Sequence, residues 1–509
     1  MKKKLILLIL LLLTISVGVT YAIFKWTSTN SDVTFNVEGC YITYDAGSNI
    51  SGASFGPALT KDDTTNVISK KISMTPECAG VTANLTLKVD SIDDGLKEQS
   101  FIYELYDGTS KIANGNFADA TTGKIYNLLN TKTLTKDTTQ KYTLYIYIDG
   151  NQDNPTTMGG KSFSFTLGAS GENALYKKPP VNAVTLVESL DDHTAGDSGS
   201  GVYKVTHNAI PASSSATGSE IPAVTDYRYY GPSPNNYICL DMEGGSTCPD
   251  KHLYRIIGSI YEEKENTNRI KVIKATPLTD GTTKVFSWDY TSSGSYSNIW
   301  ATITSGNYSN SLTSGSQLMK LLNSGLWWNG TSGSYYNHNA TATNITTATN
   351  VNFTNYKLSD KAKSYITTSR YYLGGYNGAP KTNEMYGYER GTLRYNTDRP
   401  LYWDGVVGLM YPSDYGYATG NTCVTGTKLY DYDERCKNKD WLYISNTDQW
   451  LMSPHSGGSD PMFGVDSPGY VDHHFSGNIF SVRPVFFLTS SASITDGEGS
   501  STNPYILSE

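Results

Sequence analysis

Three histidines and two aspartates lie close together near the C-terminal end of the sequence, and these residue types can bind metal ions or transfer protons. They are His455, Asp466, Asp472, His473 and His474. Neighbouring residues of a β-strand point to opposite faces, so the adjacent histidines cannot both bind one metal ion. The group has no known metal-ligand spacing and no G-x-S-x-G nucleophile motif. We therefore predict a solvent-exposed or partner-contacting segment, with no metal ion and no cofactor.

Six cysteines offer redox chemistry, metal binding or disulfide bonds. None has the C-x-x-C spacing of a zinc site. An even number of cysteines in an exported protein permits complete pairing, and the spacing here favours near neighbours. The predicted pairs are Cys239–Cys248, Cys423–Cys436 and, by remainder, Cys40–Cys78.

One further acidic motif resembles the start of a calcium loop. Asp149, Asn151 and Asp153 match the opening of an EF-hand, but Asn154 and Gly160 stand where that loop needs its glycine and its glutamate. We predict an Asx-rich turn here rather than a calcium site.

The histidine-containing segment lies between apolar segments that must hold it in place. Two tryptophan-led segments, 441–444 and 450–452, precede it, and the apolar run 482–488 follows. Loops fixed at both ends by rigid elements often carry binding residues. The sequence therefore predicts a displayed loop over 453–479 that forms the partner-facing surface.

Candidate binding residues in this loop are those without a sustained apolar period. Aromatic rings edged by hydrogen-bonding groups suit sugar stacking or a protein hot spot. The alternative for each aromatic residue is that its ring packs onto the fold. The candidates are His455, Phe463, Asp466, Tyr470, His473, His474 and Phe475.

Four residues in the flanking segments are predicted to be structural. Trp441 and Trp450 read as buried residues, and Arg483 and Pro484 lie inside the last apolar run. An unpaired charge in such a run is costly. We therefore favour an ion pair between Arg483 and a loop carboxylate such as Asp466 over a surface position.

Length and composition limit the possible classes of protein. A chain of 509 residues predicts two or more domains. The net charge of −8 has no basic stripe, which argues against nucleic acid as a partner. Few charged residues, with 39 tyrosines and 47 glycines, favour an exported, mainly β protein with some α.

The chain is predicted to have four parts. Residues 1–24 have three lysines and then an apolar run, as in a signal peptide or a transmembrane anchor, which places the rest at the cell surface, or secreted if the signal is cleaved. Residues 25–171 alternate apolar and polar positions between turn signals, which predicts an antiparallel β-sandwich. Residues 172–225 are predicted as a hinge and a polar linker: a Pro-Pro sequence forms the hinge, residues 184–190 can form one or two helical turns, and residues 191–220 have little regular structure. Residues 226–509 form the second domain.

Local patterns predict several elements of the second domain. The segments 252–261 and 269–274 form a hairpin of two isoleucine-rich strands. Leucines at positions 318, 321 and 322 follow a helical period, with Ser316 as the N-cap and Gly325 at the end. A second short helix extends from a Ser359 cap to Tyr365.

Longer motifs carry a family resemblance over roughly residues 226–509. They are YGPSPNNYICL, HLYRIIGSIY, RIKVIKATPL, WDGVVGLMYPSDYGYA, WLMSP, VRPVFFL and ITDGEGSSTNPYIL. This region resembles a domain of Firmicutes surface proteins that is related to formylglycine-generating-enzyme-like, C-type-lectin-like domains. The resemblance implies an α+β C-type-lectin-like fold in which the RPV strand lies beside a loop that some relatives diversify to bind new partners.

The resemblance also raises catalytic possibilities that this sequence does not match. Formylglycine-generating enzymes use reactive or copper-binding cysteines, and other members of the superfamily bind iron through H-x-x-x-H-x-E. Cys423 and Cys436 instead flank a hydrophilic loop, which favours a structural bridge, and the iron motif has no counterpart.

The first domain resembles a second family. The segments YTLYIYIDGNQDNP and KSFSFTLGASG are similar to the camelysin and biofilm-matrix-fibre family, over roughly residues 20–172. This implies a jelly-roll-like β-sandwich behind an export signal. Some camelysin-like relatives are described as metallopeptidases, but this chain has no H-E-x-x-H motif.

These observations favour a non-catalytic adhesion or binding protein of the cell surface. A stalk-like β-sandwich near the membrane would carry a binding head for an extracellular glycan or protein. The alternative is an extracellular enzyme or sensor subunit that uses a pocket in the C-terminal domain. A nucleophile–base pair or a metal site would favour the alternative, and the sequence pattern contains neither.

Overall fold

The structure, a computed structural model, divides the chain into two compact units, Met1–Pro179 and Pro180–Glu509. The predicted signal or anchor segment, Cys40 and Asp153 lie outside the residues that it describes. Among the described residues, no helix is long and apolar enough to cross a membrane. The structure describes residues 25–27, 41–45, 50–53, 56–152, 158, 160–172, 175–177, 180–191, 199–279, 285–291, 295–302, 315–336, 349–378, 380–432 and 434–508.

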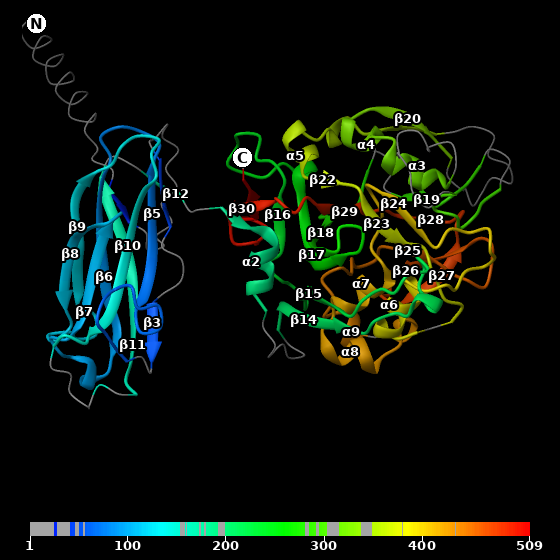
Figure 1. The fold of residues 1–509 in the computed structure, drawn as a ribbon. Coiled ribbons are helices and arrows are strands. Elements are labelled where there is room, and N and C mark those ends of the chain that lie inside the picture. The colour runs from blue at the N-terminus through cyan, green and yellow to red at the C-terminus, as the bar shows by residue number, and fades with distance from the viewer. Residues whose placement is uncertain are drawn as a thin grey trace, which may run out of the picture. The chain divides into compact units, whose positions relative to one another are not determined.

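The N-terminal unit contains two β-sheets that share one apolar core (Figure 1). The first sheet consists of β1 (Lys25–Thr27), β3 (Ile50–Ala53), β6 (Thr82–Ile92), β9 (Ile125–Thr133) and β11 (Ser162–Glu172). The second sheet consists of β2 (Tyr41–Asp45), β4 (Pro57–Ala58), β5 (Ile68–Pro76), β7 (Phe101–Asp107), β8 (Ser110–Asn116), β10 (Gln140–Asp149) and β12 (Leu175–Lys177).

The alternation in the sequence decides which face of each strand is buried. Leu85, Leu87 and Val89 of β6 are fully buried, as are Leu144 and Ile146 of β10. Successive residues of a strand point to opposite faces, so these side chains form one inner surface. The prediction of strands that are buried on one side is confirmed.

The acidic motif after β10 forms a turn. The backbone N–H of Asn151 donates to Oδ1 of Asp149 over 3.0 Å, and the Asn151 side chain donates to the same oxygen over 2.9 Å. This is the geometry of an Asx turn, in which the aspartate oxygens are occupied by neighbouring N–H groups.

The C-terminal unit is built around a ten-stranded sheet. The predicted isoleucine-rich hairpin is β17–β18, and its central isoleucines are buried in the core. Its main strand order is β13 (Val181–Asn182), β30 (Ser493–Asp496), β31 (Tyr505–Leu507), β16 (Tyr237–Cys239), β17 (Leu253–Glu262), β18 (Thr267–Lys274), β29 (Val485–Leu488) and β22 (Ile366–Thr367). The other two strands are β14 (Gly201–His207) and β15 (Val224–Tyr230), which pair with each other, and β15 also pairs with β17.

A second, five-stranded sheet and two short hairpins complete the β-structure of this unit. The five-stranded sheet has the order β19 (Val285–Ser287), β28 (Ile479–Ser481), β25 (Gln449–Pro454), β26 (Pro461–Val465) and β27 (Val471–Phe475). The hairpins pair β20 (Ser332–Tyr335) with β21 (Thr349–Asn352), and β23 (Ser369–Tyr372) with β24 (Tyr402–Gly405).

The helices of the C-terminal unit are short. Ser316 caps α3 by accepting from the N–H of Met319, and Ser359 caps α5 by accepting from the N–H of Ala362, so both predicted caps are confirmed. The helices are α2 (Ala183–Ser189), α3 (Gln317–Asn323), α4 (Leu326–Asn329), α5 (Asp360–Ser364), α6 (Thr382–Glu389), α7 (Pro412–Tyr417), α8 (Asn421–Gly426) and α9 (Glu434–Lys437).

The expectation of little regular structure between residues 191 and 220 does not hold for the described residues, because β14 lies there. The helical turns predicted at residues 184–190 are observed as α2. β13 lies at the end of the predicted hinge, and residues from 180 onward belong to the C-terminal unit. Asn182 caps α2, while β13 pairs with β30 from the far end of the chain. A strand partner so distant in sequence leaves no local pattern, which explains why β13 was not predicted.

Buried ion pairs fix α7 against the main sheet. Asp414 lies 2.9 Å from Arg228 of β15 and 2.5 Å from Lys271 of β18, and all three side chains are almost fully buried. Arg228 also lies 2.7 Å from Asp226. A buried charge without a partner is costly, so these contacts hold the start of α7 in one position.

Candidate functional site

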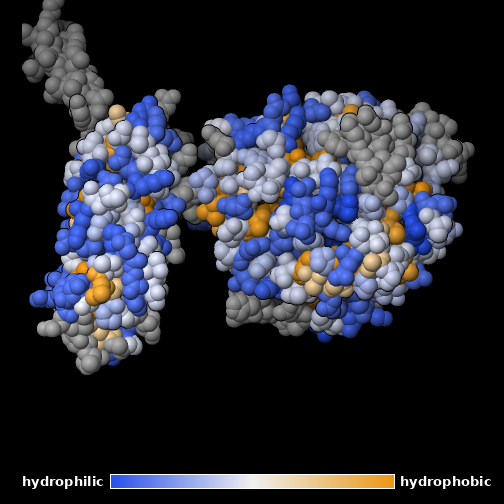
Figure 2. Space-filling model, in the orientation of Figure 1, coloured by the Kyte–Doolittle hydropathy of each residue, from blue (hydrophilic) through white to orange (hydrophobic). Residues whose placement is uncertain are grey.

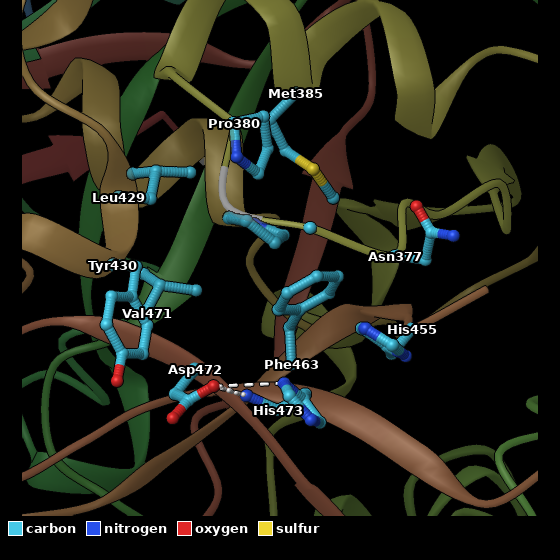
Figure 3. Close-up of a pocket in the computed structure, with 12 residues that line it drawn as sticks. Asn377, Pro380, Met385, Leu429, Tyr430, His455, Phe463, Val471, Asp472 and His473 are labelled. Carbon is cyan, nitrogen blue, oxygen red and sulfur yellow. Dashed lines mark hydrogen bonds and ion pairs between the residues drawn. The ribbon is translucent and has the colours of Figure 1, made fainter. Parts of the chain in front are cut away.

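A cleft with a volume of about 350 Å³ opens beside β26 and β27 in the C-terminal unit (Figure 3). One wall comes from these strands and from the residue that follows β25. The opposite wall comes from α6, from the segment that precedes it and from the segment between the two cysteines of the Cys423–Cys436 bridge. The cleft therefore combines residues that are far apart in the sequence.

The segment 453–479, which we predicted as a displayed loop, is mainly a β-hairpin. β26 and β27 pair antiparallel, and the N–H of Asp466 donates to the carbonyl of Tyr470 across the turn over 2.9 Å. Gly469 lies in this turn with φ +103°, a conformation that glycine adopts without strain. The register places Phe463 opposite His473, so both face the cleft.

The floor of the cleft is apolar. Met385 of α6, Leu429, Phe463 and Val471 are almost fully buried, and each lines the cavity. In Figure 3, Met385 and Phe463 reach toward each other from opposite sides of the cavity. The visible face of the C-terminal unit is mostly hydrophilic, with scattered hydrophobic patches (Figure 2).

The rim of the cleft is polar and aromatic. The rings of His455 and His473 stack with centroids 4.3 Å apart. Asp472 Oδ1 lies 3.0 Å from Nδ1 of His473, and Tyr430 on the opposite wall is 49% exposed. The rim thus offers hydrogen-bonding groups and one accessible ring to a bound molecule.

The surroundings of His455 lower its pKa and thereby favour the neutral imidazole. Burial lowers its pKa, and the neighbouring His473 lowers it further, while a backbone hydrogen bond at Asn377 and the charge of Asp472 act in the opposite direction. Its Nδ1 accepts from the N–H of Gly457 over 3.2 Å. A neutral ring with an accepting Nδ1 carries its hydrogen on Nε2, so His455 is a hydrogen-bonding group rather than a cation.

The two adjacent histidines point to opposite faces of β27. His473 faces the cleft, while His474 lies 2.7 Å from Asp466 and its ring is 4.7 Å from Phe480. Within the residues that the structure describes, no group of three or more His, Cys, Asp or Glu side chains is placed to hold a metal ion.

Comparison with known proteins adds no family to this description. No protein-family model matches the sequence, and no curated protein is significantly similar to it. The site must therefore be interpreted from its own geometry.

Of the seven candidate binding residues, the structure brings three together at the cleft. His455, Phe463 and His473 line it. Phe463 is only 4% exposed, so for this residue the alternative of a ring that packs onto the fold applies. The ring of Tyr470 lies 5.7 Å from that of Tyr430, just outside the cavity.

The other three candidates lie elsewhere. Asp466 and His474 are paired with each other on the opposite face of the hairpin. Phe475 is 57% exposed, and its ring contacts that of Tyr296 at 6.2 Å rather than the cleft.

Sequence reasoning missed most of the opposite wall. Asn377, Pro380, Met385, Leu429 and Tyr430 line the cleft but lie between about 20 and about 80 residues before the predicted loop. One signal was present, because Tyr430 is an aromatic residue in a hydrophilic segment whose ends are joined by the Cys423–Cys436 bridge.

The two predicted structural tryptophans are buried beside the site. Trp441 donates from Nε1 to the carbonyl of Tyr229 over 3.0 Å, and Trp450 donates to the carbonyl of Phe286 over 2.8 Å. The ring of Trp450 stacks on Phe480 at 4.4 Å. These contacts fix the base of the hairpin that carries the cleft residues.

The predicted ion pair between Arg483 and Asp466 is absent from the structure. Arg483 is buried and donates to the carbonyls of Lys274 and Leu442, and Pro484 is buried beside it. Burial and the nearby charge of Arg255 lower the pKa of Arg483 to about 9, while Asp440 acts in the opposite direction. Carbonyl oxygens replace the expected carboxylate because main-chain acceptors lie within reach of the guanidinium.

Two of the three predicted disulfides are confirmed. Cys239 pairs with Cys248, and Cys423 pairs with Cys436. The third predicted pair includes Cys40, which lies outside the described residues. Disulfide bonds of this kind fit an oxidising environment.

Proposed function

We propose that the C-terminal unit is a non-catalytic binding head for an extracellular glycan or protein ligand. The observation that carries this proposal is the cleft itself, in which an apolar floor is edged by His455, His473, Asp472 and Tyr430. Ligand sites commonly combine a hydrophobic surface with a few placed polar groups. Tyrosine and histidine also present flat ring faces to sugars or to peptide side chains.

The resemblance to Firmicutes surface proteins supports the same function. Under this proposal, the C-terminal unit has the α+β C-type-lectin-like fold of formylglycine-generating-enzyme-like domains, and β29 is the central RPV strand. The N-terminal unit is a stalk-like, jelly-roll-like β-sandwich, and residues 1–24 attach or export the chain. The whole protein then acts at the bacterial cell surface.

The test is binding by the full-length protein in detergent micelles to an array of glycans and to a set of extracellular proteins. Binding that is weakened by His473→Ala but retained by His474→Ala would support the proposal, because only His473 faces the cleft. Both variants must keep the thermal stability needed for a valid comparison. Binding that neither substitution changes would move the site away from this cleft.

The same experiment distinguishes the alternative of an extracellular enzyme or sensor subunit. A bound glycan recovered unchanged after long incubation agrees with a binding head. A glycan that is cleaved or modified in a His473-dependent manner would overturn the non-catalytic assignment.

A further inference from the structure

The cleft adjoins a second, smaller hollow on the other side of His455. His455 lines both, and the second hollow is also lined by Asn298, Arg394, Tyr395 and Arg399. The main chain links the two, because the N–H of Ser456 donates to the carbonyl of Tyr376 and the segment 373–378 contributes to both walls. The cleft and the hollow therefore share His455 as a common lining residue.

The size of the second hollow limits what it can accept. Its volume is about 20 Å³, which is room for roughly one water-sized group and not for a sugar ring or a side chain. A small polar group that projects from a larger molecule would fill it.

The charge of the second hollow is positive. Arg394 and Arg399 line it, and among the described residues their hydrogen bonds go to carbonyl and amide oxygens and not to carboxylates. Arg399 is 9% exposed and is held by Asn298 and by the carbonyl of Ser459, to which it donates over 2.9 Å. The Arg394 guanidinium donates to the main-chain carbonyl of Arg399 over 2.6 Å, which fixes it beside this segment.

A nearly buried guanidinium without a contacting anion is unfavourable. Burial lowers the pKa of Arg399, with Tyr395 and Asp460 acting in the opposite direction, and Asp460 is the carboxylate whose charge reaches it. Carbonyl and amide acceptors and the Tyr395 ring, 5.5 Å from the guanidinium, replace part of the lost hydration, but no carboxylate of the described residues forms an ion pair with Arg399. A carboxylate that enters the hollow would supply the missing charge and a strong hydrogen bond.

The ends of the combined site differ in charge and share an aromatic character. Asp472 lies at the cleft end, and the two arginines lie at the other end. Tyr430 is 49% exposed at the first end and Tyr395 is 47% exposed at the second. An anionic group is therefore repelled from one end and attracted to the other, while both ends offer a ring face.

We propose that the cleft and the hollow form one site for a carboxylate-bearing oligosaccharide. A sugar ring lies in the cleft against Phe463 and Tyr430, and a carboxylate projects past His455 toward Arg394 and Arg399. The exposed tyrosine faces favour sugar rings over a peptide, and the small hollow admits one oxygen of a carboxylate but not a bulkier acidic group. This inference rests on the proposed binding function and specifies its ligand.

The test compares pairs of ligands that differ only in charge. Sialylated and uronic-acid oligosaccharides, each with its carboxyl-reduced neutral counterpart, are titrated into the full-length protein by calorimetry. We expect at least one acidic sugar to bind about tenfold more tightly than its neutral counterpart, which is the effect of one charge-assisted hydrogen bond. Raising the salt concentration reduces this preference.

Arg394→Gln is the decisive variant, because Arg394 is less buried than Arg399 and its loss disturbs the fold less. It should abolish the preference for the acidic sugar over its neutral counterpart. Lys204→Gln removes the same charge from an exposed position on β14 and should leave the preference intact.

The possible failures can be told apart. Equal binding of acidic and neutral sugars, or a preference that survives Arg394→Gln, overturns this inference while the binding function stands. Binding of acidic peptides in place of sugars also overturns it. Absence of binding to every ligand of both kinds overturns this inference and the proposed function together.

Discussion

His473 stacks on His455 with ring centroids 4.3 Å apart and planes inclined by 20°. This contact joins β27 to the segment that follows β25, so one edge of the cleft depends on two strands. It also means that the adjacent histidines, 473 and 474, have different environments although they have the same side chain. The difference makes them a matched pair for mutagenesis.

His473→Ala should weaken ligand binding by about tenfold or more, because it removes a rim group and the stacking partner of His455. His474→Ala should leave binding unchanged and lower the free energy of unfolding by about 1 kcal/mol through loss of its Asp466 contact. Binding titrations and urea denaturation of both variants provide the measurement. The reverse pattern would place the site on the other face of the hairpin.

Two phenylalanines in the same hairpin should differ in how much stability is lost when each is replaced by alanine. Phe463→Ala removes a ring that is 4% exposed and should cost about 3–5 kcal/mol of stability. Phe475→Ala removes a ring that is 57% exposed and should change stability by less than about 0.5 kcal/mol. Thermal or urea unfolding measures both. A large loss for Phe475→Ala would show that its exposed ring is essential to the fold.

The two disulfides should differ in their effect on binding. The Cys423–Cys436 bridge closes the segment that carries Leu429 and Tyr430, so its replacement by two serines should weaken binding and lower stability by about 3 kcal/mol. Replacement of the Cys239–Cys248 bridge should lower stability but leave binding intact, because it closes a segment outside the cleft. Affinity and unfolding free energy are measured for both double variants. Equal ligand affinities of the two double variants would show that the Cys423–Cys436 bridge does not support the binding site.

Glu389 should make the stability of the protein depend on pH. Burial raises its pKa to about 7 from an ordinary value of 4.5, and Asp414 adds to the increase, while Arg390 and Ser413 oppose it. The folded state therefore holds this proton more tightly than the unfolded state. Its contribution is complete below pH 4.5 and is lost as the pH rises through about 7, by a total of about 3 kcal/mol.

Glu389→Gln should remove this dependence, since a glutamine keeps the acceptor for Ser413 and does not ionise. The variant should match the wild type at acidic pH and exceed it in stability above about pH 7. Glu384→Gln, on the exposed face of the same helix, is the control and should behave as the wild type. Denaturant unfolding across this pH range checks both, and a parallel decline of wild type and Glu389→Gln would assign the dependence to another group.

Local patterns were enough to predict much of the secondary structure. The alternation in β6 and β10, the caps at Ser316 and Ser359, and two cysteine pairs follow from interactions between residues near each other in the sequence. Strand period, capping hydrogen bonds and short loop closure all act over a few residues. These features can therefore be predicted from the sequence.

The partners of short strands were decided only by tertiary structure. β26 and β27 contain glycine, proline, aspartate and histidine, and their pattern resembled a loop. They form strands because β26 pairs with β25 on one side and with β27 on the other, which supplies hydrogen bonds to both. β13 likewise forms only because β30 reaches it from the far end of the chain.

The sequence by itself determined that Phe463, His455 and His473 lie in a region with unusual polar and aromatic content. Only the tertiary structure decided that Met385, Leu429 and Tyr430 face them, and that Arg483 bonds to carbonyl oxygens instead of Asp466. The physical reason is that the cleft forms between segments that are distant in the sequence, and their contacts depend on how the core packs. No local period records that relation, because burial and the available hydrogen-bond partners are set by the whole fold.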